Sequence, residues 1–192
     1  MSKKSVVKKY AQGRENILIE AYIEHGPSKL QQEIDISPKH WLVVFDYLVF
    51  EHNLLYKCII SNTQFFVDEY VRHGSSHIRE MLNIVNKKYD LIWNFLFDFI
   101  AISNDGLYYH VLHHRDRYML ALKARGSDFV RKVLGVWKPK YEENWSKVLD
   151  ILLNAVCESI FSEQTFEHGL NSFCRLMNGV REHRPIFKSG II

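Results

Sequence analysis

Apolar residues recur along this chain every three or four positions, which is the spacing of an amphipathic helix. No run alternates valine, isoleucine and threonine between turn residues, as half-buried strands do. With 4 Pro and 9 Gly among 192 residues, the periodic segments have few breaks. The pattern predicts an all-α protein.

The expected helices are separated by start and stop signals. Gly26-Pro27 ends the first segment, and Ser37-Pro38 opens the third because serine caps free amides and proline is pre-set for the first helical position. A helix over residues 51–73 would span roughly 30 Å, and Gly74 followed by Ser75 is typical of a helix end and a new start. The full set of expected helices is 15–25, 28–36, 38–48, 51–73, 81–100, 107–124, 129–137, 141–161 and 163–180.

The stretch from Leu30 to Leu55 combines a short helix, a turn and a second helix with polar and basic residues at its start. A helix fits the major groove of DNA, and its first turn reaches base edges and phosphates. The stretch is therefore a candidate DNA reader. An αα-hairpin that only packs is the alternative, since short helix-turn-helix patterns are common by chance. The residues of the first turn are Ser37, Pro38, Lys39, His40 and Trp41.

Basic residues are concentrated at the N-terminus. The net charge is only +3, but the first 14 residues contain no acid. A basic arm ahead of a helix-turn-helix can lie along phosphates and raise affinity in a salt-dependent way. An exposed, disordered tail is the alternative. The basic residues are Lys3, Lys4, Lys8, Lys9 and Arg14.

Several classes of protein are disfavoured. The three cysteines, Cys58, Cys157 and Cys174, show no CxxC spacing, which favours a reducing compartment. No apolar stretch reaches the roughly 18 residues of a membrane span, and the charged N-terminus is unlike a signal peptide. The sequence has no phosphate-binding glycine loop and no GxSxG motif. We expect a cytoplasmic protein that is not an enzyme, binds no membrane and needs no cofactor.

His110, His113 and His114 form a dense cluster of metal-capable side chains. Residues four apart share a helix face, so His110 and His114 could hold zinc together with His77 or Glu80. No HExxH pattern is present, which excludes a zinc-protease site. Surface or packed histidines are the commoner outcome, so we expect no metal. A helical-bundle metalloprotein is kept as a third hypothesis.

The last two expected helices are apolar on more than one side, and such helices need a second surface to cover them. We expect a homodimer through this pair. Burial inside the monomer is the alternative.

The segment LQQEIDIS, residues 30–37, resembles the I-A-x-x-A-G-V-S motif of the TetR family of bacterial repressors. The matching residues are Leu30, Ile34, Ile36 and Ser37, whereas Gln31 and Asp35 replace an alanine and a glycine. A second stretch, residues 114–129, is similar to the E-N-R-D-F-Y-x-A-L-L-x-x-x-G-x-x-x-F motif of a C-terminal subgroup that includes regulators of dihydroxyacetone metabolism.

The resemblance implies a dimeric, ligand-responsive repressor that binds double-stranded DNA. It implies a three-helix helix-turn-helix domain at residues 1–50 and a helical ligand-binding and dimerisation domain at residues 51–192. The residues expected at the DNA are Ser37, Lys39, His40, Trp41, Tyr47, His52, Asn53 and Lys57. Those expected around an unknown small-molecule effector are Trp93, Phe97, Tyr109, His113, Tyr118 and Trp137.

Two alternatives stay open beside this interpretation. Trp41 and the aromatic residues of the expected pocket would equally fill a hydrophobic core. The atypical Gln31 and Asp35 favour an all-α interaction module that keeps the fold but has lost DNA reading. Its affinity for nucleic acid would be absent or independent of salt.

Overall fold

The computed structural model describes residues 2–162, and the side chains among them up to Ala155, apart from Lys29 and Glu33. Within residues 2–162 every regular element is helical and no strand occurs, which confirms the all-α fold class. The chain divides after Gly106 into two compact units. The domain boundary expected after residue 50 falls inside the helix Pro38–His52. The assignment of residues 1–50 to DNA binding stays a prediction.

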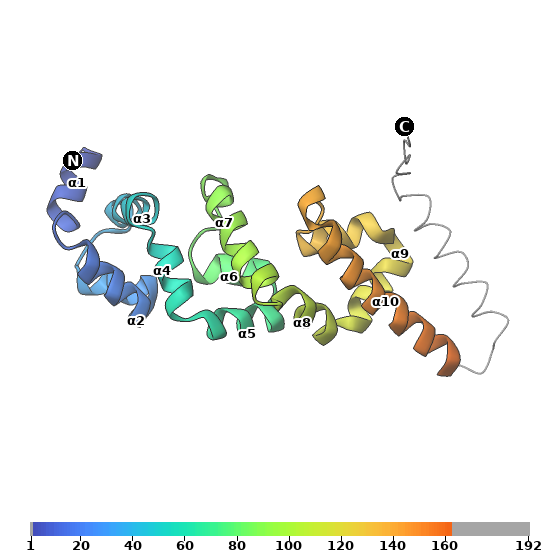
Figure 1. Ribbon diagram of the computed structural model, residues 1–192. Coiled ribbons are helices and arrows are strands. Elements are labelled where there is room, and N and C mark those ends of the chain that lie inside the picture. Colours follow the sequence, from blue (N-terminus) through green and yellow to red (C-terminus); the bar gives the residue numbers. More distant parts are fainter. Residues whose placement is uncertain (1, 163–192) are drawn as a thin grey trace, which may run out of the picture. The chain divides into compact units, whose positions relative to one another are not determined.

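The first unit begins with four helices: α1 (Lys3–Tyr10), α2 (Glu15–Glu33), α3 (Pro38–His52) and α4 (Leu54–Ser61). α1 packs against α3, and α2 packs against both α3 and α4 (Figure 1). The basic N-terminus is therefore a helix and not a disordered tail. It is held in place because Val6 and Ala11 are each only 1% exposed, so that burial of apolar surface favours the helix.

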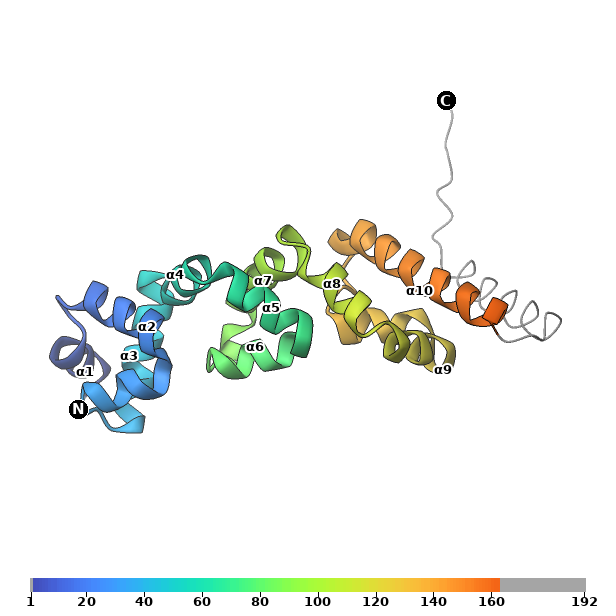
Figure 2. The same cartoon turned by 90° about the horizontal axis from the view of Figure 1, so that it is seen from below.

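The first unit continues through α5 (Thr63–His73), α6 (Ser75–Met81), the 3-10 turn η1 (Lys87–Tyr89), α7 (Asp90–Phe97) and the π-helical turn η2 (Asp98–Ser103). α5 and α6 lie next to each other, joined by Gly74 (Figure 2). The single helix expected over residues 51–73 is wrong. The chain leaves helical geometry at Asn53, with φ 54°, and again at Asn62, with φ −131°. Asparagine tolerates the left-handed region better than other side chains do.

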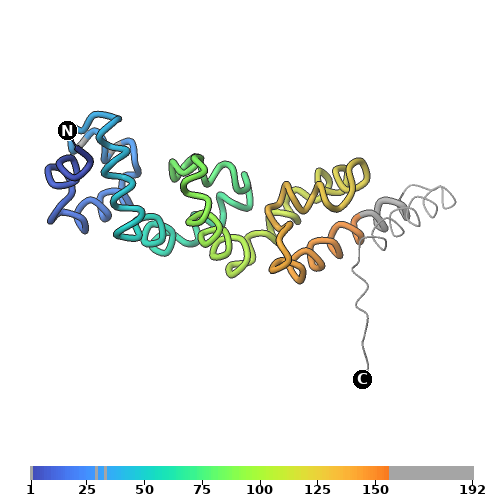
Figure 3. The backbone as a smooth tube through the Cα atoms, turned by 90° about the horizontal axis from the view of Figure 1, so that it is seen from above, coloured from blue at the N-terminus to red at the C-terminus, as the bar shows by residue number. Residues whose placement is uncertain are grey.

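The second unit contains α8 (Gly106–His113), α9 (Arg115–Leu134), η3 (Pro139–Tyr141) and α10 (Glu142–Ser162). α9 and α10 pack side by side (Figure 3). The expected break at Gly126 is confirmed, but the helix expected over residues 107–124 is interrupted at His114. The helix expected at residues 163–180, and with it the expected dimer face, lies outside the described residues.

The same backbone turn occurs three times along the chain, at positions roughly 50 residues apart. Gly26, Gly74 and Gly126 have φ/ψ of 75/176°, 79/−173° and 78/175°, and each separates two helical segments. Nine positions later the backbone is again left-handed, at Asp35, Asn83 and Gly135. The following amide then donates to the carbonyl five positions before it, from Ile36 to Gln31 at 3.4 Å, Ile84 to Arg79 at 2.8 Å and Val136 to Arg131 at 2.9 Å.

The buried side chains follow the same register. In each repeat, the residue four positions before the glycine is buried, as are the residues four, fifteen and nineteen positions after it. These sets are Tyr22, Tyr70 and Leu122; Leu30, Ile78 and Val130; Trp41, Tyr89 and Tyr141; and Phe45, Trp93 and Trp145. The part of the chain that the structure describes therefore contains three helical repeats, which the sequence pattern did not reveal because they share few residues besides the turn glycine and the core positions.

The second and third repeats share a further contact. Arg79 Nη2 lies 2.7 Å from Asp90 Oδ1, and Arg131 Nη2 lies 2.7 Å from Glu142 Oε2. Each guanidinium also lies over the tryptophan of its own repeat, 5.8 Å from the ring of Trp93 and 5.7 Å from that of Trp145. In the sequence, Gly169 and Asn178 show the same nine-residue spacing outside the described residues.

Candidate functional site

Exposed lysines surround α1. The helix KKSVVKKY carries no acidic residue in its first turn and ends with Lys8 and Lys9. Its one fully buried residue is Val6, which faces the unit's core. Because α1 packs through this apolar position, the lysine side chains are left in solvent: Lys3, Lys4, Lys8 and Lys9 are all exposed.

The start of α3 lies beside the end of α1. The rings of Tyr10 and His40 are 6.3 Å apart, and Lys39 next to His40 is exposed. Ser37 occupies the N-cap with extended backbone and Pro38 follows, as the sequence predicted, although the serine side chain makes no capping hydrogen bond. Lys3, Lys4, Lys8, Lys9, Lys39 and His40 together are called the basic surface below.

Trp41 does not belong to this surface. Its side chain is 3% exposed, and its ring packs 5.8 Å from that of Phe45. Of the residues expected at the DNA in the first turn of α3, the exposed ones are thus Ser37 and Lys39, with His40 half-buried. The tryptophan anchors the core of the first unit, which was its alternative role.

Tyr47 and His52 form a separate cluster with Glu15. The Tyr47 hydroxyl donates to Glu15 Oε1 at 3.0 Å, and the rings of Tyr47 and His52 are 4.8 Å apart. Hydrogen bonds from backbone amides, and then from Tyr47, hold the pKa of Glu15 below its usual value. A carboxylate at this place repels phosphate. Asn53 and Lys57, the other residues expected at the backbone of DNA, are exposed.

The residues expected around an effector are partly buried in the cores of the two units and partly exposed on the surface of the second. Trp93 and Phe97 are core residues of the first unit, with ring centroids 6.1 Å apart. In the second unit, Tyr118 is buried, whereas Tyr109 and Trp137 are more than half exposed. His113 is exposed as well.

His110 has a packing partner. It is 6% exposed, and its Nε2 is hydrogen-bonded to the Tyr118 hydroxyl at 2.8 Å. Burial raises the pKa of Tyr118, an effect that the charge of Arg117 opposes. The neighbouring His114 ring lies 4.7 Å from the rings of both His110 and His113. His110 is thus packed among aromatic rings, with His114 beside it, whereas His113 remains exposed.

Among the residues with described side chains, metal-ligand geometry is found at Glu69, His73 and His77. The sequence signal for it was an E-x-x-x-H-x-x-x-H spacing, which sequence analysis missed because it singled out the denser histidines of α8. His77, which the sequence offers as a third ligand for the His110 cluster, belongs to this group.

Cys58 is a free and buried thiol. Burial raises its pKa to about 11, so it is almost entirely protonated at neutral pH. A protonated thiol is a poor nucleophile. The other two cysteines lie outside the residues with described side chains.

Comparison with known proteins adds no assignment. No protein-family model, curated protein or solved structure matches this chain. Within the described residues, no helix is both long and apolar enough to cross a membrane. The resemblance to the TetR family therefore depends on the motifs at residues 30–37 and 114–129 alone.

Proposed function

We propose that this protein is a helical-repeat binding protein that contacts nucleic acid through the basic surface. The observation that carries the proposal is the packing of an acid-free, lysine-rich α1 against α3, beside the exposed Lys39. Two sequence segments about 30 residues apart thereby bring lysines into the same part of the first unit, where Tyr10 at the end of α1 lies beside His40 at the start of α3. Phosphate-rich polymers are attracted by a positive patch of this kind.

The expected binding is mainly electrostatic. Each phosphate neutralised by a lysine releases condensed counterions, so the affinity falls with salt at a slope of about −0.9 per contact on double-stranded DNA. Five lysines in contact with phosphates would give a slope of about −4.5 in a plot of log affinity against log salt.

Helical repeats support the binding part of the proposal. The three repeats share their core and differ at exposed positions, as expected when one scaffold presents different surfaces. The four lysines of α1 precede the first repeat's glycine, whereas α4 and α8, which precede the second and third glycines, hold one lysine, Lys57, between them. The second and third glycine turns thus form without a lysine-rich helix before them.

A ligand-responsive transcriptional regulator of the TetR type is the narrower form of the proposal. In that form Ser37, Lys39 and His40 read the major groove, and two copies joined through their last two helices bind the halves of a palindrome. An effector would change the separation of the two readers. The exposure of Ser37 and Lys39 at the start of α3 supports this form.

The test compares two variants with equal charge change. In one variant, Lys3, Lys4, Lys8 and Lys9 are replaced by glutamine. In the control variant, glutamine replaces four lysines that are exposed in the described part of the second unit, Lys123, Lys132, Lys140 and Lys147. Affinity for random-sequence duplex DNA and for single-stranded RNA is measured between low and moderate salt. We expect the α1 variant to lose most of its affinity and salt dependence, and the control to retain both.

Equal losses in the two variants would refute the assignment of the binding surface. No affinity in the folded wild-type protein would favour the interaction module that does not bind nucleic acid. Recovery of one shared palindromic site from random genomic fragments would support the transcriptional regulator.

A further inference from the structure

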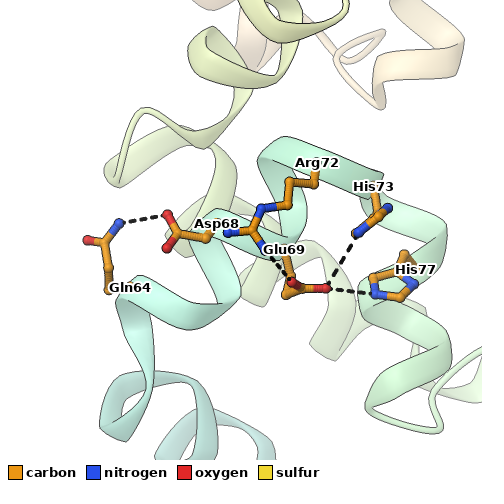
Figure 4. A network of polar contacts seen from close by, with 6 residues as sticks. All are labelled: Gln64, Asp68, Glu69, Arg72, His73 and His77. Carbon is orange, nitrogen blue, oxygen red and sulfur yellow. Dashed lines mark hydrogen bonds and ion pairs between the residues drawn. The ribbon is translucent and has the colours of Figure 1, made fainter.

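One carboxylate and two imidazoles converge where α5 meets α6 (Figure 4). Glu69 Oε2 lies 3.0 Å from His77 Nε2 and 3.8 Å from His73 Nε2. The two imidazole rings are 4.5 Å apart, and all three ligand atoms lie within 4.8 Å of one another. The same nitrogen of each ring thus faces the same carboxylate oxygen.

The break at Gly74 creates this arrangement. In a straight helix, Glu69 and His77 would be separated by about 12 Å along the axis, since each residue rises about 1.5 Å. Gly74 turns the chain with φ 79° between α5 and α6, and places His77 on the first turn of the next helix, facing back toward Glu69. A left-handed φ is readily adopted by glycine.

The two separations from Glu69 are close to that between neighbouring ligands of a tetrahedral metal ion. With bonds of about 2.0–2.2 Å to nitrogen and oxygen, two ligands of a tetrahedral zinc ion are separated by about 3.4 Å. The two separations from Glu69 Oε2 lie on either side of that value. We propose that Glu69, His73 and His77 bind a divalent transition-metal ion of the zinc type. This site is separate from the basic surface and does not depend on the proposed function.

Arg72 orients the carboxylate. Its Nη1 donates to Glu69 Oε1 at 3.2 Å, so the other oxygen, Oε2, is the one that faces the histidines. A ligating carboxylate held by a second polar group is a common feature of metal sites. Gln64 and Asp68 on the same helix pair with each other at 2.9 Å, apart from the three ligands.

Solvent can supply a fourth ligand. The side chain of Glu69 is 15% exposed, while those of His73 and His77 are 51% and 38% exposed. The carboxylate is thus largely covered and the imidazoles are open on one side. Two nitrogens and one oxygen suit zinc and its first-row neighbours, whereas magnesium and calcium prefer oxygen ligands alone.

The repeat architecture shows that the fold does not require these residues. The equivalent positions hold Ala21, His25 and Lys29 in the first repeat and Ala121, Arg125 and Phe129 in the third. Only the second repeat combines three metal-capable side chains at these positions. The other two repeats build the same glycine turn without them.

The test measures metal binding by the full-length protein after treatment with a chelator. Zn²⁺ affinity is determined by competition with a chromophoric chelator, and Co²⁺ is added to detect the visible absorption of a tetrahedral site. The variants are His77→Ala and Glu69→Gln, which keeps the shape of the side chain. The control is His25→Ala, a histidine at the position of His73 in the first repeat. Far-ultraviolet circular dichroism verifies that each variant is folded.

We expect one tight site in the wild-type protein and in the His25→Ala control. Both ligand variants should lose more than about 100-fold in metal affinity, since replacing a residue that only hydrogen-bonds to a ligand already costs about 10–100-fold. Zn²⁺ should raise the melting temperature of the wild-type protein but not that of the ligand variants. No tight binding by the wild-type protein, or equal affinity in wild-type, His77→Ala and Glu69→Gln proteins, would overturn the proposal and leave an ion-pair network.

Discussion

Replacement of Gly126 by alanine tests the glycine turn on which the repeats depend. Gly126 has φ 78° and ψ 175° inside α9, and an added Cβ would meet nothing within 4 Å. Steric clash is therefore excluded, and the whole effect comes from the backbone conformation. An L-residue held in this essentially glycine-only region costs about 1–3 kcal/mol.

The sign of the effect distinguishes this turn from a continuous helix. If residue 126 were helical, alanine would stabilise the protein by about 1 kcal/mol relative to glycine. With the observed backbone, we expect destabilisation instead. In a unit of this size, each kcal/mol corresponds to about 4–8 °C in melting temperature.

Thermal unfolding followed by circular dichroism at neutral pH measures this shift. Gly26→Ala provides an independent copy in the first repeat, where φ is 75° and an added Cβ also has open space. Ala124→Gly, at an exposed helical position, calibrates the assay with an expected loss of about 1 kcal/mol. An unchanged or raised melting temperature in Gly126→Ala would refute the assigned backbone and, with it, the repeat.

Three further changes have defined outcomes. Gly106→Ala places a Cβ 2.6 Å from the Ile100 carbonyl oxygen. We expect the free energy of unfolding in urea to fall by about 3 kcal/mol, the upper end of the range for overpacked sites. A smaller loss than that of Gly126→Ala would contradict this contact. In a variant whose other cysteines are serine, Cys58 should react with an alkylating reagent at pH 8 only after unfolding, because its pKa is raised to about 11 by burial; rapid labelling of the native protein would show that the thiol is accessible. Burial also raises the pKa of Tyr22, whose hydroxyl donates to the Leu82 carbonyl at 3.3 Å. Because this folded-state pKa lies above the unfolded value of about 10, its stability contribution is complete below that pH and is lost as the pH rises above it. The urea midpoint should therefore fall between pH 9 and 11, and less so in Tyr22→Phe; parallel curves would argue against a buried hydroxyl.

The repeat architecture separates residues that the fold requires from residues that it does not. Where three copies of one turn share their core, a residue outside that core and found in a single copy is not required by the turn. The lysines of α1 and the group of Glu69, His73 and His77 both meet this criterion. They are therefore the positions at which substitution is expected to change binding more than stability.

The sequence by itself determined the helical class and most of the local breaks. Apolar spacing predicted an all-helical chain, and the structure confirms it over residues 2–162. Gly26, Gly74 and Gly126 were expected to end helices, and Ser37-Pro38 to begin one, as they do. Such signals are readable because they depend on the backbone preferences of one or two residues.

Tertiary structure decided the rest, because burial is settled by partners far away in the sequence. The lysine-rich N-terminus is helical since Val6 and Ala11 are buried where α1 packs against α3, and Trp41 turns into the core to meet Phe45. Glu69 and His77 lie eight positions apart, and only the direction of the chain after Gly74 brings their side chains to 3.0 Å. Residue spacing gives the distance between side chains within one straight helix, whereas the angle between two helices comes from the packing of their cores.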